Sequence, residues 1–439
     1  MNLKNKNRPG YKKTKVGWIP EDWECVFLGE VTQKISDGIH TTPKYVEDSQ
    51  YYFVNGNNLV NEQICIFKET KCVSKEEYIK YKKDLDDDTL LMSINGTIGS
   101  VAYYRGETVV LGKSAAYIKC RNTLNKHYTL NLLKSKKANN FYRGEWTGST
   151  IKNLSLASLK AFPIPLPPLP EQEAIAEVLE CWDDAIRNYE KKIEKKKNIK
   201  KGLMQRLLSG MQRLPGFKPR NSTERHGNKS DGIPEGWKEV QLGQFAEFAG
   251  GYGFPEELQG KEFGEIPFIK VSDMNLAGNE KYISRANNYV PMKTVISKRW
   301  KPLPKDSVVF AKVGAALLLN RRRILTKKTL IDNNMMGAIP KKINPYFLYL
   351  ILLRYDFARL VQVGALPSVN QSDLKSIKLS LPSLLEQREI SNVCFESENE
   401  INILEQKLTI LKNQKKYLLN NLVTGTIRLP QFRPRNYTE

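Results

Sequence analysis

The feature that most constrains the fold of this chain is a long stretch of sequence that occurs twice. Residues 203–224 and 418–439 are identical at 12 of 22 positions, where average composition would give roughly one or two identities. The two stretches are separated by about half of the chain, a separation that fits a large domain with an added element. We therefore expect a duplicated unit.

The repeat extends well beyond this stretch. Residues 17–29 align with 231–243 through a shared IPE-x-W pattern, and residues 158–177 align with 372–391 through a shared proline, a Glu-Gln pair and an isoleucine. The offset between the copies changes by a single position from the first landmark to the second, so the register holds across the whole unit. Between these landmarks the two halves diverge.

The divergent regions have the pattern of compact α/β or β-rich globules. Short β-branched or alternating runs broken by Gly, Asn and Pro predict strands and turns at 51–60, 89–104, 107–120, 266–276 and 306–319. A helix is expected to follow in each half, at 127–142 and at 345–362. For the second of these, Asn344 is the expected N-cap and Pro345 the first helical residue.

A long helix should then close each half. Proline-rich segments precede Glu171 and Glu386, and no further proline occurs until Pro215 and Pro430, so helices are expected to begin near these glutamates. Steps of four and three residues place apolar side chains at eight of ten positions in each helix. The predicted seam residues are Ile175, Leu179, Trp182, Ile186, Tyr189, Ile193, Leu203 and Leu207 in the first helix and Ile390, Ile401, Leu404, Leu408, Leu411, Leu418 and Leu422 in the second.

A narrow apolar stripe on a helix of this length must be buried against a partner. The duplicated helix is the expected partner, because the intervening globule allows antiparallel pairing. The alternative is that each helix packs on its own globule. The predicted fold class is α+β, with two α/β globules, each followed by a long helix, and with the two helices paired as an antiparallel coiled coil of pseudo-twofold symmetry.

The composition favours a polyanionic partner. The formal net charge is +22, which points to nucleic acid, with a generically basic protein as the alternative. Six cysteines form no CxxC pair and only three histidines are present, so neither a zinc site nor any other metal site is expected. The basic N-terminus has no apolar core and the apolar runs are short, which predicts a protein of the cytoplasm without a membrane span.

No motif for catalysis stands out. Residues 106–114 resemble a phosphate-binding loop, but the glycine spacing is wrong and the β-branched run predicts a strand. The acidic run 85–90 could be taken for metal ligands, yet Asp88 and Asp306 both precede an expected strand, which favours a turn role. We therefore predict no catalytic residues.

The ordered set of motifs resembles a known family, the DNA-specificity subunit of type I restriction-modification systems. The resemblance covers the whole chain and depends on the duplicated IPE-x-W openings, PPLPEQ (167–172) and PSLLEQ (382–387), the helix ends LMQRLLSG and LLNNLVTG, and DGIHTTPKY (37–45). Two departures exist: the second half has GGYGFPEEL in place of the DGIHTTP run, and Leu385 replaces the usual proline.

The resemblance implies that each globule is a target recognition domain reading one half of a split double-stranded DNA site. The paired helices would set the distance between the half-sites. The subunit would have no cofactor of its own, because S-adenosylmethionine, ATP and Mg would be bound by two methyltransferase and two restriction subunits. The expected segments are 1–165 (first recognition domain), 166–210 (first spacer helix), 211–230 (linker), 231–380 (second recognition domain), 381–424 (second spacer helix) and 425–439 (tail).

Polar and basic residues on the expected loops are the candidates for DNA contact. In the first globule they are His40, Thr41, Thr42, Lys44, Tyr45, Asn57, Asn58, Lys113, Ser114, Ser149, Thr150 and Lys152. In the second they are Tyr252, Lys270, Ser272, Asp273, Lys312, Arg321, Arg322, Arg323, Asn333, Asn334, Ser368, Asn370 and Gln371. The arginine run 321–323 is the first choice for phosphate contact, and His40 could equally stabilise its own turn. The lysine run 191–201 is interpreted mainly as solvated charge.

Two other functions stay open. One is a self-contained nucleic-acid methyltransferase or nuclease whose motifs are not recognisable. The other is a basic coiled-coil adaptor that binds RNA or membranes without sequence preference.

Overall fold

The structure is a computed structural model that describes residues 9–217, 233–361 and 367–433. Its contacts divide the chain into two compact units, Met1–Lys191 with Glu405–Glu439 (unit 1) and Lys192–Leu404 (unit 2). Both long helices cross this division, since α5 covers Leu169–Leu208 and α10 covers Leu384–Leu422. Residues 218–230 of the expected linker, 231–232 of the second expected domain and 434–439 of the expected tail lie outside the described residues.

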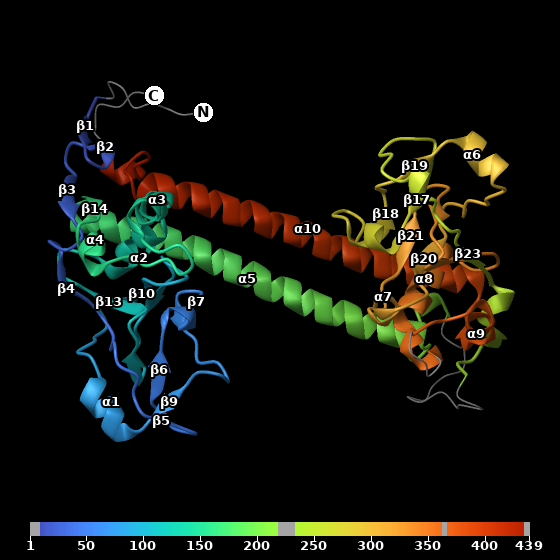
Figure 1. Cartoon of the computed structure of the whole chain (residues 1–439), viewed down its shortest axis with the longest axis horizontal. Helices are drawn as coiled ribbons and strands as arrows, with labels where there is room; N and C mark the ends of the chain where they lie inside the picture. The colour runs from blue at the N-terminus through green and yellow to red at the C-terminus, as the bar shows by residue number, and fades with distance from the viewer. Residues whose placement is uncertain (1–8, 218–232, 362–366, 434–439) are drawn as a thin grey trace. The chain divides into compact units, whose positions relative to one another are not determined.

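Unit 1 contains an antiparallel sheet in the order β11-β10-β13-β4 and a second sheet in the order β12-β6-β9-β5. Figure 1 shows β4, β13 and β10 side by side. The strands are β1 Tyr11–Thr14, β2 Gly17–Pro20, β3 Glu24–Phe27, β4 Thr32–Asp37, β5 Tyr45–Val46, β6 Tyr52–Val54, β7 Leu59–Val60, β8 Gln63–Ile64, β9 Cys72–Val73, β10 Thr89–Ser93, β11 Val101–Tyr103, β12 Val109–Leu111, β13 Ala115–Cys120 and β14 Pro163–Leu166. The short helices are α1 Lys75–Tyr81, α2 Lys126–Lys134, α3 Lys136–Glu145 and α4 Leu156–Lys160.

Unit 2 contains a sheet in the order β16-β23-β20-β21-β18 and a smaller one in the order β19-β17-β22. The strands are β15 Lys238–Gln241, β16 Ala246–Gly250, β17 Ile266–Ile269, β18 Tyr282–Ile283, β19 Tyr289–Val290, β20 Val308–Ala311, β21 Arg323–Leu325, β22 Leu330–Ile331, β23 Met335–Pro340 and β24 Lys378–Leu381. The short helices are α6 Met292–Ser297, α7 Ala315–Leu318, α8 Pro345–Arg354 and α9 Gln371–Ser376.

The two units share one strand plan despite their divergent sequences. The central antiparallel run β11-β10-β13-β4 of unit 1 corresponds to β21-β20-β23-β16 of unit 2. The second sheet of each unit contains a parallel pair of strands, β6 with β12 in unit 1 and β17 with β22 in unit 2. An antiparallel pair joins the strand just after each IPE-x-W segment to the strand before the next long helix, β3 with β14 and β15 with β24. The duplication seen in the sequence is thus a duplication of fold.

Several predicted elements are confirmed and three are corrected. Asn344 caps α8 by accepting a hydrogen bond from the Phe347 N–H, as predicted. The predicted helix 127–142 is two helices, because Ser135 ends α2 and caps α3. The predicted helix 345–362 ends at Arg354 and is followed by the 3-10 turn η6 (Phe357–Leu360). The apolar run after β20 is the helical turn α7 rather than strand.

Within each unit, parts of α5 and α10 contact one another in antiparallel directions. In unit 1 the pairs Asp183–Lys415 and Glu190–Lys412 have N–O distances of 2.5 and 2.6 Å, so one residue number rises as the other falls. In unit 2, Lys196 pairs with Glu400 at 2.8 Å. All the predicted seam residues are buried or half-buried. The α+β fold with contacting long helices is therefore confirmed.

A buried carboxylate at the start of α5 holds unit 1 together. The Glu171 side chain is 1% exposed and accepts a hydrogen bond from the Trp23 indole N–H at 2.8 Å. The Arg428 guanidinium donates to both carboxylate oxygens of Glu171, at 2.9 and 2.6 Å, and also to Asp22. Burial alone would lower the pKa of Arg428, but these carboxylates raise it above its ordinary value. We call Trp23, Glu171 and Arg428 the unit 1 clasp.

The same clasp is built in unit 2 from the second copies of the tryptophan and glutamate and from the arginine of the first copy of the repeated tail. Glu386 at the start of α10 accepts from the Trp237 indole N–H at 3.3 Å. The Arg213 guanidinium donates to its two oxygens at 2.6 and 2.8 Å. The IPE-x-W opening, the Glu-Gln pair and the arginine of the repeated tail are therefore the three parts of one contact.

The glutamine of each Glu-Gln pair ties the long helix to a short helix of the globule. Gln172 accepts from the Asn125 backbone N–H at 2.9 Å, and Gln387 accepts from the Asn344 N–H at 3.0 Å. Asn125 and Asn344 are the N-caps of α2 and α8. The helices α2 and α8 are therefore equivalent, and their residues are matched by counting from Asn125 and Asn344.

A glycine follows each long helix because the chain must turn sharply there. Gly210 and Gly425 have φ of 70° and 66°, the left-handed conformation that ends many helices. A Cβ would lie 2.3 Å from Pro234 at the first position and 2.4 Å from Pro20 at the second. The repeated sequence Gly-x-x-Arg-Leu-Pro therefore serves to return the chain onto the IPE-x-W segment.

Replacing Arg428 with methionine should destabilise unit 1. The substitution leaves the buried Glu171 carboxylate without its cation, which costs about 3–5 kcal/mol for a buried pair. The matched control is Lys378→Met, which removes an ion pair with Glu239 on exposed side chains, worth about 0–1 kcal/mol. Urea unfolding followed by tryptophan fluorescence measures both free energies of unfolding. Equal losses in the two variants would contradict the role of the clasp.

Candidate nucleic-acid interface

Five loops of unit 1 meet at one end of its sheets. They follow β4 (38–42), β6 (55–58), β10 (94–99) and β12 (112–114), and precede α4 (147–153). Hydrogen bonds join them: Gly56 N–H to Ser114 Oγ at 2.9 Å, Gly96 N–H to the Lys152 carbonyl at 3.0 Å, and Ile39 N–H to the Leu111 carbonyl at 2.7 Å. The loops therefore form one continuous polar surface rather than separate excursions.

The equivalent loops of unit 2 are joined in the same way. Tyr252 N–H donates to the Ile331 carbonyl at 2.9 Å, and Lys312 N–H donates to the Asn334 carbonyl at 2.9 Å. Val369 N–H donates to the Lys312 carbonyl at 3.0 Å. The side chains on these loops differ between the units, while the backbone contacts beneath them are retained.

A glycine at the first loop of each unit is required by close backbone packing. A Cβ on Gly38 would lie 1.9 Å from the Leu111 carbonyl oxygen, and a Cβ on Gly251 would lie 1.9 Å from the Asp332 carbonyl oxygen. Gly38 belongs to the DGIHTTP run and Gly251 to the GGYGF run. The two runs, which look unrelated in sequence, are thus structural equivalents.

Most of the candidate contact residues are accessible. The exposed ones are His40, Thr41, Thr42, Lys44, Tyr45, Asn57, Lys113, Ser149, Thr150, Lys152, Ser272, Arg321, Asn333, Asn334, Ser368 and Asn370. The half-buried ones are Ser114, Tyr252, Lys270, Lys312, Arg323 and Gln371. These residues come from the loops just described, apart from Lys44, Tyr45 and the arginines, which flank them.

Asn58 and Asp273 are buried and have structural roles, which corrects their assignment as contact residues. Each caps the 3-10 turn after the equivalent strands β6 and β17. Asn58 Oδ1 accepts from the Asn55 N–H at 3.0 Å, and Asp273 Oδ2 accepts from the Lys270 N–H at 2.7 Å. Asp273 Oδ1 also accepts from the Asn287 N–H at 2.9 Å. Their polar atoms are occupied within the protein.

Arg322 does not fit the phosphate contact expected of the arginine run. Its side chain is 1% exposed and its guanidinium lies 3.7 Å from the centre of the Phe357 ring. Burial lowers the pKa of this guanidinium. Arg323 is half-buried and donates to the Met274 carbonyl at 3.1 Å. Arg321 is the exposed member of the run, so phosphate contact stays a prediction for this residue.

His40 and the loops beside it illustrate what the sequence could and could not indicate. Its side chain is 69% exposed, and Nε2 lies 2.9 Å from Asp37 Oδ2, so both a turn contact and an accessible ring are present. Asn95, Thr97 and Trp146 also lie on the loop surface, although the sequence did not single them out. The Lys152 ammonium lies 3.9 Å from the centre of the Trp146 ring. In the sequence, an aromatic residue (Trp146) that precedes a nearby lysine (Lys152) is the pattern that could have indicated this contact.

Two of the lysines in the run 191–201 are paired rather than only solvated. Lys196 contacts Glu400 at 2.8 Å and Lys200 contacts Glu398 at 3.5 Å, both on α10. Among residues 9–217, 233–361 and 367–433, no group of three or more His, Cys, Asp or Glu side chains has the arrangement of a metal site. Within the same part of the chain no helix is long and apolar enough to cross a membrane.

Comparison with models of protein families matches residues 20–198 and 234–427 to the type I restriction modification DNA specificity domain. A putative type I restriction enzyme MjaX specificity subunit from Methanocaldococcus jannaschii is 28% identical over 438 residues, covering 95% of this chain and 97% of the relative. Relatives of this kind are named as specificity subunits, in agreement with the non-catalytic subunit that the sequence indicates.

Two solved structures share the fold. A structure titled for complex assembly and conformational transition of the type I R-M system has a TM-score of 0.59 at 14% identity, covering 93% of this chain and 99% of that one. The crystal structure of a type I restriction-modification system S subunit from M. genitalium has a TM-score of 0.51 at 17% identity, covering 91% and 96%. At these identities the likeness concerns the fold alone.

Replacing Asp273 with alanine should destabilise unit 2, whereas replacing its neighbour Ser272 should not. The first substitution leaves the part-buried N–H groups of Lys270 and Asn287 without acceptors, at a cost of about 1–3 kcal/mol in total. Ser272 is exposed, so its loss should change the free energy of unfolding by less than about 0.5 kcal/mol. Urea unfolding of both variants checks this, and an Asp273→Ala variant as stable as the parent would return Asp273 to the set of contact residues.

Proposed function

This chain belongs to the type I restriction-modification DNA specificity family, and from that premise we propose that it recognises a bipartite, asymmetric site in double-stranded DNA. Each loop surface would read one half-site. The chain would carry no catalytic residues and would recruit two methyltransferase subunits, with two restriction subunits in the full complex. S-adenosylmethionine, ATP and Mg would be bound by those partners, in the cytoplasm.

The observation that carries the proposal is a pair of matching scaffolds with unlike loop side chains. Lys113 and Ser114 follow β12 in unit 1, and Asn333 and Asn334 follow the equivalent strand β22 in unit 2. His40 follows the first close backbone contact in unit 1, where unit 2 has Gly253. Two scaffolds that present different donors and acceptors would prefer different base pairs.

The charge of the loops suggests how affinity and specificity would divide. Exposed cations such as Lys113, Lys152 and Arg321 would neutralise phosphates, which gives affinity that falls steeply as salt rises. Exposed amides and hydroxyls such as Asn57, Asn333 and Ser368 would reach base edges in a groove. The phosphate contacts would position the loops and the polar contacts would select the sequence.

The paired helices are proposed to set the spacing between the half-sites. The helix α5 contains 40 residues and α10 contains 39, so the two rods are matched in length. Because the rise of an α-helix is fixed at about 1.5 Å per residue, the number of residues determines the length of each rod. Two loop surfaces that bind the same face of B-DNA need half-sites whose centres are about one helical turn apart. The length of the helices, rather than the loops, would therefore decide how many base pairs separate the half-sites.

Exchanging residues 231–378 for the same region of another specificity subunit should change one half-site and leave the other unchanged. The mechanism requires this because each loop surface reads independently. Mapping of methylated adenines in cells that carry the chimaera and the methyltransferase subunit measures the recognised sequence. A change in both half-sites would contradict independent reading, and methyl transfer to DNA by the purified chain alone would favour a self-contained methyltransferase.

Inserting one heptad into both long helices should lengthen the spacer without altering either half-site. One heptad adds about 10 Å to each helix, which corresponds to about three base pairs of B-DNA. The insertion keeps the heptad pattern, so the apolar seam stays in register. Methylation mapping of the variant reads the spacer directly, and an unchanged spacer would rule out the helices as its determinant. If the insertion abolished all methylation, a variant with one heptad deleted from both helices would be mapped instead, and its spacer should be shorter.

A further inference from the structure

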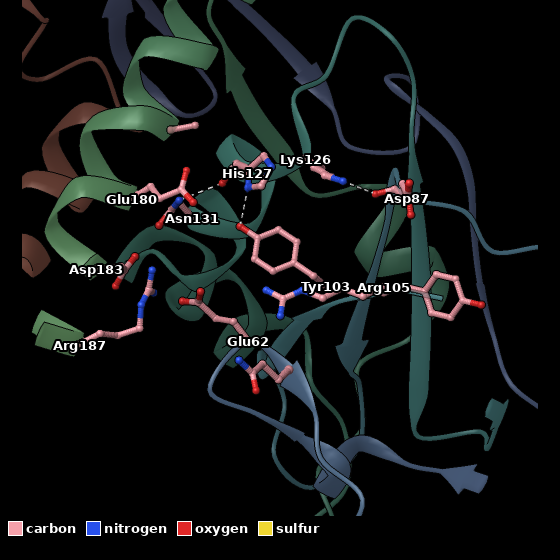
Figure 2. A pocket seen from close by; sticks show the side chains of 13 residues that line it. Glu62, Asp87, Tyr103, Arg105, Lys126, His127, Asn131, Glu180, Asp183 and Arg187 are labelled. Carbon is pink, nitrogen blue, oxygen red and sulfur yellow. Dashed lines mark hydrogen bonds between the residues drawn. The ribbon is translucent and has the colours of Figure 1, made fainter. Parts of the chain in front are cut away.

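A cavity of about 460 Å³ lies in unit 1 between the globule and one face of α5. Figure 2 shows Glu180, Asp183 and Arg187 of α5 on one side and Glu62, Tyr103 and Arg105 on the other. The cavity is separate from the loop surface proposed for DNA, and its volume is in the range of small-molecule sites. Four carboxylates line it together with two arginines, one lysine and His127.

One polar atom in the wall has no partner. The Asn131 side chain lines the cavity and the residue is 5% exposed. Its Nδ2 donates to the His127 carbonyl at 2.9 Å, but its Oδ1 is buried without a hydrogen-bond donor. A buried acceptor without a donor costs about 1–3 kcal/mol, so this atom points to a donor that a ligand would supply.

Unit 2 shows what fills the same place in the other copy. Tyr103 N–H donates to the Glu62 carbonyl in unit 1, and Ile324 N–H donates to the Lys281 carbonyl in unit 2, at 3.1 and 2.8 Å. Because these contacts join equivalent strands, Lys281 stands at the position of Glu62. The Lys281 ammonium donates to Glu398 at 2.8 Å and to the Tyr346 hydroxyl at 3.0 Å.

The carboxylates of the two copies therefore hold different numbers of ammonium groups. Glu398 in unit 2 contacts both Lys281 and Lys200. Asp183 is its equivalent in the register of the repeat, and it contacts Lys415, the equivalent of Lys200. In unit 1 a glutamate occupies the position of the second lysine, so Asp183 receives no ammonium from that position, and Glu62 itself pairs with Lys134.

Two other replacements at the cavity put a hydrogen-bond acceptor in unit 1. Counting from the equivalent caps Asn125 and Asn344, the polar Asn131 stands where unit 2 has the buried Leu350. On the long helices, Glu180 stands where unit 2 has Phe395, whose ring lies 5.0 Å from the Lys281 ammonium. At these two positions unit 1 carries hydrogen-bond acceptors where unit 2 carries apolar side chains.

The basic groups in the wall are already engaged. Lys126 donates to the Asp87 carbonyl at 2.5 Å, Arg187 pairs with Asp184, and the Arg105 guanidinium lies 5.7 Å from the centre of the Tyr103 ring. Lys134 pairs with Glu62. The Glu180 carboxylate has no hydrogen bond or ion pair with any residue in the part of the chain that the structure describes. An added cation would therefore meet three acceptors: Glu180, Asn131 Oδ1 and the Asp183 carboxylate that already receives Lys415.

From this comparison we propose that the cavity binds an alkylammonium group, either of a free diamine or polyamine or of a lysine side chain of another protein. The ammonium would take the place that Lys281 fills in unit 2, with Glu180, Asp183 and Asn131 Oδ1 accepting its hydrogen bonds. The proposal does not depend on DNA recognition, and its test uses the purified full chain without DNA or partner subunits.

Isothermal titration calorimetry with 1,5-diaminopentane and with Nα-acetyl-lysine amide tests the site, and 1,5-pentanediol is the uncharged control of the same length. We expect saturable binding of one amine per chain and none of the diol. Tighter binding of the diamine would identify a free polyamine as the source, and tighter binding of the lysine amide would identify a protein side chain. No saturable binding of either amine at about 1 mM, or equal binding of the diol, would overturn the proposal.

Two variants locate the binding. Glu180→Gln keeps the size of the side chain and should weaken amine binding at least tenfold, as should Asn131→Leu, which installs the residue of unit 2. Glu173→Gln on the exposed face of α5 makes the same chemical change outside the cavity and should leave binding unchanged. A thermal unfolding midpoint close to that of the parent shows that each variant is folded. Unaltered binding in both cavity variants, or equal weakening in Glu173→Gln, would place the amine elsewhere and refute the site.

Discussion

The fold depends on one buried ionic contact that is made twice. A glutamate at the start of a long helix receives hydrogen bonds from a tryptophan indole at the beginning of the globule and from an arginine just past the end of the other long helix. Burying a carboxylate is costly unless its acceptors are satisfied and its charge is neutralised, and the clasp does both. Three segments of the chain are thereby fixed together in each unit. The loops are placed by the sheets that these segments support.

The main architecture could be predicted from the sequence because its signals are local or repeated. The internal repeat, the proline before each helix and the heptad pattern identified α5 and α10 to within two residues of their starts. The N-cap at Asn344 followed from a residue type with one strong preference. The break between α2 and α3 could not be predicted in the same way, because a serine such as Ser135 can occupy a helix interior as well as a cap.

The contact surface was less predictable because exposure depends on the fold. A run of three arginines looks uniformly basic in sequence, yet the middle one, Arg322, lies against Phe357 in the core. Asn58 and Asp273 resemble accessible polar residues, but the 3-10 turns that they cap exist only once the strands before them are paired. The charge reversal between Glu62 and Lys281 was invisible as well, since those two positions become equivalent only through backbone hydrogen bonds across the sheet.

The clasp of unit 1 has a consequence for the order in which the chain can fold during synthesis. Glu171 and Arg428 are separated by 257 residues, and the unit 1 core includes Leu419, Leu422 and Val423. The clasp of unit 2 joins Arg213 to Glu386 across 173 residues. The part of the protein that leaves the ribosome first is therefore the part that completes its core last, and its strands must wait for a segment translated almost at the end. During that interval the apolar surface of unit 1 is open to solvent and to chaperones, whereas unit 2 already has all of its own residues.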